Sequence, residues 1–237
     1  MEHGHSEEEI KSRIATAPKA SLLKDFVYGG IDGTVTTFAV VAGVQGAGLQ
    51  TNVILILGIA NVLADGFSMA VGNYSGNKAE SDDTARIRAI EKRHIKEVPD
   101  GEKAEVREIL ASKGLSGVAL EQAVEEITKD EDSWINIMLT DEYGRSTVEA
   151  SPWKTALATF VAFLVCGIVP LLPFLIGLND PFFSSAVAAG AVFFGIGMMK
   201  SFWSLAAWWR SGLETLLIGA LAATIAFQAG KWVEQFL

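Results

Sequence analysis

Residues 53–76 read VILILGIANVLADGFSMAVGNYSG, and this stretch decides the fold class of the 237-residue chain. It is longer than the ~20 apolar residues that an α-helix needs to cross a bilayer. Asn61, Asp65 and Met69 recur in it every four residues, so on a helix they share one face. A polar and sulfur-bearing stripe on a spanning helix indicates either the lining of a pore or a seam between packed helices.

A second carboxylate, Asp32, interrupts the preceding apolar stretch, DFVYGGIDGTVTTFAVVAGVQGA (25–47). A carboxylate at membrane depth costs at least about 2.5 kcal/mol, so such residues usually face a bundle interior or a water path and mark ion or proton routes. The simpler alternative is that Asp32 and Asp65 only accept hydrogen bonds between packed helices. If these carboxylates mark an ion or proton route, the candidate transport-path residues are Asp32, Asn61, Asp65 and Met69.

Counting outward from these stretches, five apolar runs are long enough to span a bilayer. They cover residues 25–47, 53–76, 153–177, 182–204 and 212–236. The sequence therefore predicts an all-α membrane protein with five transmembrane helices in contact with lipid. Pro170 and Pro173 are expected to kink the third of these helices.

A charged stretch, 77–152, separates the second run from the third. It holds 18 Asp/Glu and 11 Lys/Arg, and so carries −7 of the net charge of −9. An acidic compact segment favours a cationic partner over nucleic acid, and a solvated helical surface is its other explanation. The expected organisation is an N-terminal segment (1–24), two spans (25–76), a helical metal-binding domain (77–152) and three spans (153–237).

The distribution of basic residues predicts the orientation. Five spans put the N-terminus, 77–152 and the 205–211 loop on one side, and all of the 19 Lys/Arg except Lys231 lie on or border that side. The opposite loops, 48–52 and 178–181, contain no basic residue. The N-terminus and 77–152 are therefore expected to be cytosolic.

Within 77–152 the sequence predicts three or four helices and no strand. The helix of the second span should continue to about Glu97, and Pro99 should begin the next helix, which Gly114 ends. Ser116 is expected to cap a third helix with its side chain. A fourth helix is expected from Ser133 to Gly144.

Three pairs of potential metal ligands lie on these helices at spacings of three or four residues. The pairs are Glu91 with His94, Glu102 with Glu105, and Met138 with Glu142. Such pairs on facing helices recur in carboxylate-bridged di-iron bundles. Oxygen and imidazole ligands suit Fe(II), Mn(II) and Zn(II), and a thioether disfavours Mg(II). Any one pair is also common on an exposed helix, so the prediction rests on finding three pairs in one small unit.

These residues leave three classes of function open. One is a transporter of divalent metal ions. Another is a membrane-tethered di-iron oxidase or peroxidase, although that chemistry has no use for Asp32, Asp65 and Met69. A third is a metal sensor that binds ions without moving them. We favour the transporter of divalent metal ions. A transporter of this kind is not an enzyme, and no prosthetic group is expected in it.

The stretches DGTVTTFAVVAGVQGA and GIANVLADGFSMAVGNYSGNKAE resemble the vacuolar iron transporter family, and the likeness continues through WINIMLTDEYG and RSGLETLLIGALAATIAF. The resemblance implies a homodimer that exports Fe(II), with Mn(II) as a second candidate, from the cytosol in exchange for protons, along a path at the dimer interface. It implies path residues at Asp32 and Met69. In the cytosolic domain it implies metal ligands at Glu91, Glu102, Glu105, Met138 and Glu142.

Three positions depart from the family pattern. Asn61 and His94 stand where plant members of the family carry glutamates, and Leu139 replaces another glutamate. His94 retains a metal ligand, whereas Asn61 cannot titrate. Asp65, one turn along, is expected to supply the missing charge. The expected location is the plasma membrane in a prokaryote and a vacuole-like membrane in a eukaryote.

Overall fold

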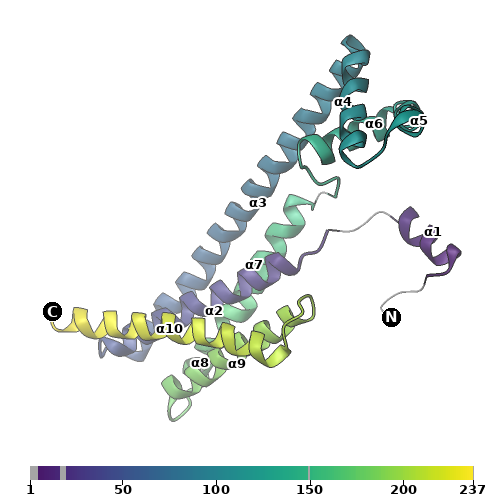
Figure 1. The fold of residues 1–237 in the computed structure, drawn as a ribbon. Helices are drawn as coiled ribbons and strands as arrows, with labels where there is room; N and C mark the ends of the chain where they lie inside the picture. Colours follow the sequence, from purple (N-terminus) through teal and green to yellow (C-terminus); the bar gives the residue numbers. More distant parts are fainter. Residues whose placement is uncertain (1–4, 17–19, 149, 237) are drawn as a thin grey trace. The chain divides into compact units, whose positions relative to one another are not determined.

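The computed structural model describes residues 5–16, 20–148 and 150–236, and all of its regular elements are helices (Figure 1). The chain forms two compact units. One comprises Ser21–Ser75 and Ser151–Leu237, and the other Met1–Ala20 and Gly76–Ala150. We call them the spanning unit and the acidic unit.

The spanning unit contains five helices that are long and apolar enough to cross a membrane, as predicted. They are α2 (Leu23–Gly46), the first part of α3 (Thr51–Glu97), α7 with its continuation to Leu175 (Pro152–Leu175), α9 (Pro181–Ser201) and α10 (Trp208–Glu234). The chain is thus an all-helical, multi-pass membrane protein.

The two prolines interrupt the third span where the sequence predicts a kink. Helix α7 (Pro152–Ile168) gives way to a 3₁₀ turn (Val169–Leu171) and the short α8 (Leu172–Leu175). The hydroxyl of Ser185 on α9 donates a hydrogen bond to the carbonyl oxygen of Pro170 at 2.6 Å. A neighbouring helix therefore satisfies a carbonyl at the break, as a low-dielectric surrounding requires.

Helices α2 and α7 pack in parallel with their backbones in direct contact. A Cβ atom at Gly29 would lie 2.3 Å from the carbonyl oxygen of Thr159, and one at Gly33 would lie 2.4 Å from that of Phe163. Only glycine allows this approach, in the manner of small-residue packing between membrane helices. The two glycines thus fix the register of α2, which carries Asp32, against α7.

The acidic unit contains the second part of α3, followed by α4 (Pro99–Ser112), α5 (Gly117–Ile127), α6 (Glu131–Ile137) and a π-helical turn (Met138–Glu142). Helix α3 ends at Glu97 and α4 begins at Pro99, as predicted. Gly114 and Gly144 take the positive φ angles, +96° and +63°, that end a helix in the left-handed region. An apolar core of Val106, Leu110, Val124, Trp134 and Met138 holds the helices together.

Of the two remaining predicted helix starts, the start of the third helix is confirmed in position and that of the fourth is wrong. Ser116 occupies the N-cap position of α5, but within the described chain its side chain makes no capping hydrogen bond. Helix α6 begins at Glu131, before the predicted Ser133, because the side chain of Asp130 accepts a hydrogen bond from the backbone N–H of Ser133 at 2.9 Å.

The N-terminal segment contains a helix that the sequence analysis missed, α1 (Glu7–Ala15). Ser6 and Glu9 form a reciprocal capping box at its start. A serine followed three residues later by a glutamate was the sequence signal that could have predicted the start of this helix.

Candidate functional site

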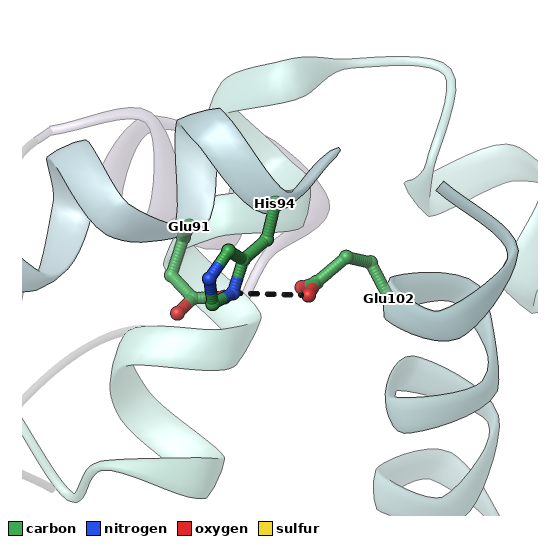
Figure 2. Close-up of side chains that lie close together, drawn as sticks. All are labelled: Glu91, His94 and Glu102. Atoms are coloured by element: carbon green, nitrogen blue, oxygen red, sulfur yellow. Dashed lines mark ion pairs between the residues drawn. The ribbon is translucent and has the colours of Figure 1, made fainter. Parts of the chain in front are cut away.

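Three predicted ligands converge where α3 ends and α4 begins. Glu91 and His94 lie on the last turns of α3, and Glu102 lies on the first turn of α4. The chain reverses at Val98–Pro99, which brings these turns together. Nδ1 of His94 is 3.4 Å from Oε1 of Glu102, and one potential ligand atom from each of the three residues lies within 4.8 Å of the others. Figure 2 shows the His94 ring facing the carboxylate of Glu102, with the ion pair between them as a dashed line.

A second group shares Glu91 with the first. It combines Glu91 with Glu105 from α4 and Glu142 from the π-helical turn, again with ligand atoms within 4.8 Å of one another. The structure therefore brings five of the six predicted acidic-unit ligands together from three elements. We call these five residues the carboxylate cluster: Glu91, His94, Glu102, Glu105 and Glu142.

Two carboxylates of the cluster are buried without full compensation. Glu91 is 1% exposed and Glu102 is 5% exposed. In the part of the chain that the structure describes, Oε2 of each has no hydrogen-bond partner. A buried carboxylate oxygen without a partner is costly and calls for a proton or a cation. The two carboxylates also lie within hydrogen-bonding distance of each other, so either a proton that they share or a bound cation would satisfy these oxygens.

Burial and the charges within the carboxylate cluster raise the pKa of two of its own carboxyl groups. Burial, followed by the charges of Glu105 and Glu91, raises the pKa of Glu102 to about 7. Burial and the charges of Glu105 and Glu91 likewise raise the pKa of Glu142. Concentrated negative charge favours bound protons or a bound cation, since both relieve the repulsion.

The π-helical turn presents Glu142 and a further residue, Tyr143, to the cluster. The backbone N–H of Tyr143 donates to the carbonyl oxygen of Met138 at 3.3 Å, which closes the wide turn. The Tyr143 hydroxyl donates a hydrogen bond to Oε1 of Glu91 at 2.9 Å. Sequence reasoning missed Tyr143, whose only signal was its place directly after Glu142. Local π-turns inside helices are frequent at functional sites.

Met138, the sixth predicted ligand, is completely buried. It packs in the apolar core of the acidic unit with Val106, Leu110, Val124 and Trp134. A core role accounts for this position, and its role as a metal ligand remains a prediction.

In the spanning unit, the four candidate path residues lie on α2 and α3. Asp32, Asn61, Asp65 and Met69 are all half-buried. Asp32 and Asp65 are close enough for their charges to interact. Nδ2 of Asn61 is buried and, among the described residues, has no hydrogen-bond partner.

Asp25, at the start of α2, is another residue that the sequence analysis did not single out. It is 6% exposed, and its Oδ1 accepts a hydrogen bond from Nδ2 of Asn73 at 2.8 Å. This bond joins α2 to α3 within the spanning unit. The sequence feature that could have identified Asp25 was its place as an acidic residue at the first position of an apolar run.

Comparison with known proteins gives consistent relatives along nearly the whole chain. "Vacuolar iron transporter 1" of Arabidopsis thaliana is 30% identical over 97% of this chain and 99% of its own length. The protein of the same name from Eucalyptus grandis is 32% identical over 90% of this chain and 87% of its own. "Vacuolar iron transporter" of Toxoplasma gondii is 30% identical over 92% of this chain and 76% of its own. Relatives named as transporters agree with the prediction that the chain is not an enzyme. The sequence profile of the VIT family matches residues 23–231, and the chain belongs to this family.

Proposed function

We propose that this protein transports divalent transition-metal ions across a membrane, with Fe(II) as substrate and Mn(II) as a second candidate. The observation that carries the proposal is the pair of buried, unpartnered oxygens of Glu91 and Glu102, as the described chain has them, beside the His94 imidazole. These donors suit Fe(II), Mn(II) and Zn(II). The iron transporters among the relatives support iron as the cargo.

The transport path in this proposal is lined by Asp32, Asn61, Asp65 and Met69. Only 22% of the apolar window of α3 is buried within the chain, and polar residues recur along that helix. A second copy of the chain would cover this surface, so the proposed path lies at the interface of a homodimer. Carboxylate and thioether groups on the path would exchange ligands with a partly dehydrated metal ion.

The proposed direction is out of the cytosol, in exchange for protons. The proposal places the N-terminus and 77–152 in the cytosol, because the basic residues gather on that side. The carboxylate cluster, with Met138 as a further ligand, would then collect metal ions before transport. The membrane is the plasma membrane in a prokaryote and a vacuole-like membrane in a eukaryote.

Metal uptake by sealed proteoliposomes tests the proposal. The purified protein is reconstituted, Fe(II) is supplied anaerobically, and a pH gradient is either imposed or collapsed with an ionophore. We expect uptake above that of protein-free vesicles, and faster uptake when the vesicle interior is acidic, because outward-moving protons then drive metal inward. Metal binding in detergent without any uptake would contradict transport and favour a sensor.

A further inference from the structure

The two carboxylate oxygens of Glu91 lie in different surroundings. Oε1 accepts the hydrogen bond from the Tyr143 hydroxyl at 2.9 Å. Oε2 is buried and, so far as the structure describes the chain, accepts no hydrogen bond. Glu91 belongs to both groups of potential ligands, so the availability of its oxygens affects every metal ion that the cluster binds.

The segment that carries Tyr143 is fastened to α3 at three points in succession. Arg145 forms an ion pair with Asp83. Leu139 packs in a buried apolar cluster with Ile87, and Tyr143 reaches Glu91. Asp83, Ile87 and Glu91 are spaced by four residues and so follow one face of the helix.

A backbone hydrogen bond also closes the turn that contains Tyr143. The backbone N–H of Arg145 donates to the carbonyl oxygen of Leu139 at 2.8 Å. The Tyr143 hydroxyl is therefore held in place by its neighbours on both sides, rather than only by the bond to Glu91. A preorganised donor of this kind orients a metal ligand from outside the coordination sphere.

We propose that Tyr143 is a positioning residue that makes Glu91 a ligand through a single oxygen and thereby selects against Ca(II). The inference rests on the proposed metal-binding role of the cluster. Fe(II), Co(II), Mn(II) and Zn(II) accept carboxylates through one oxygen, whereas Ca(II) takes six to eight oxygen ligands and readily uses both oxygens of a carboxylate. With Oε1 engaged by Tyr143, an ion that needs both oxygens of Glu91 has to compete with this hydrogen bond, whereas an ion that binds Oε2 alone does not.

The test measures Co(II) and Ca(II) binding to the full-length protein in detergent. Co(II) chloride is titrated by calorimetry and followed by its visible absorption, and Ca(II) chloride is titrated separately. Binding that Glu91→Gln removes is assigned to the cluster. Tyr143→Phe removes the hydroxyl alone. Tyr28→Phe, at a tyrosine 61% exposed on α2, is the matched control and is expected to change neither affinity.

We expect Tyr143→Phe to lower the Co(II) affinity by about 10- to 100-fold, as is typical when an outer-sphere partner of a metal ligand is lost. Its Ca(II) affinity should stay the same or rise, so that the preference for Co(II) falls. A merely structural role would lower both affinities by the same factor and would overturn the inference, as would an unchanged Co(II) affinity. If the wild-type protein shows no Glu91-dependent Co(II) binding, the proposed metal-binding role itself fails.

Discussion

Nδ1 of His94 lies 3.4 Å from Oε1 of Glu102, across the reversal between α3 and α4. The imidazole is the only nitrogen donor among the five residues of the carboxylate cluster. Around it, burial and the neighbouring carboxylates raise the pKa of Glu102 to about 7. Glu102 can therefore change charge near neutral pH, where an ordinary glutamate stays ionised.

The metal-free protein is expected to lose stability as the pH rises from 5 to 8. The pKa of Glu102 is about 7 in the folded state and 4.5 ordinarily, so the folded state binds more protons than the unfolded state between these values. The free energy of unfolding then falls with rising pH across that window. Glu102→Gln should flatten the dependence, leaving a residual slope from Glu142. Thermal unfolding in chelator at several pH values measures it, and equal slopes in both proteins would contradict the assignment.

Asp32→Asn is expected to abolish metal flux, because it removes the charge of the proposed path residue on α2 with almost no change in volume. Metal binding by the carboxylate cluster should persist. The measurement is Fe(II) uptake by proteoliposomes, with Co(II) titration of the same preparation. Glu214→Gln, which removes an exposed carboxylate of the same unit paired with Lys200 at 3.6 Å, serves as control and should retain flux. Flux near the wild-type rate in Asp32→Asn would rule out the proposed role.

Asp65→Asn should leave some downhill metal flux but remove its dependence on a pH gradient. Asn61 cannot titrate, and Asp65 is the nearest acidic residue on the same face of α3. Proton and metal would compete for this carboxylate, and such linkage is what exchange requires. Uptake is compared with the gradient imposed and collapsed. A variant that still responds fully to the gradient would leave coupling to Asp32 alone.

Gly33→Ala is expected to destabilise the spanning unit by about 1–3 kcal/mol or more, the usual cost of overpacking. The new Cβ would lie 2.4 Å from the carbonyl oxygen of Phe163, a backbone atom that cannot move aside alone. Gly195→Ala is the matched control, since in the described structure nothing outside its own helix lies within 4 Å of a Cβ there. That change should be neutral or slightly stabilising. Thermal unfolding in detergent compares the two, and equal melting temperatures would refute the packing argument.

The sequence was sufficient for the features that depend on composition and periodicity. Five apolar runs predicted the five spans, and Pro99, Gly114 and Gly144 correctly marked helix ends because their backbone preferences act locally. The pairing of Glu91 with His94 on α3, and of Glu102 with Glu105 on α4, was also within reach, since helical spacing puts each pair on one face of its own helix.

The remaining features depend on contacts between distant residues, which spacing alone does not encode. The hydrogen bond from Tyr143 to Glu91 spans 52 positions, and the π-helical turn that permits it has no sequence signal of its own. Asp25 reads as an ordinary charge at the edge of a span until the structure pairs it with Asn73. Met138 matches a ligand position by resemblance, yet its side chain packs in the apolar core.

The contact between α2 and α7 limits which helices can move during the proposed transport cycle. With a helix backbone directly against carbonyl oxygens at Gly29 and Gly33, sliding or rotation would drive residues beside the glycines that carry a Cβ, such as Tyr28, Asp32 and Thr34, into the opposing backbone. The same holds where a Cβ at Gly230 of α10 would lie 2.1 Å from the carbonyl oxygen of Gly43. We therefore expect helices α2, α7 and α10 to move together as one rigid frame. If the proposed function is correct, alternating access to the two sides of the membrane would then come from displacement relative to that frame, and α3 is the proposed path-lining helix that lies outside it.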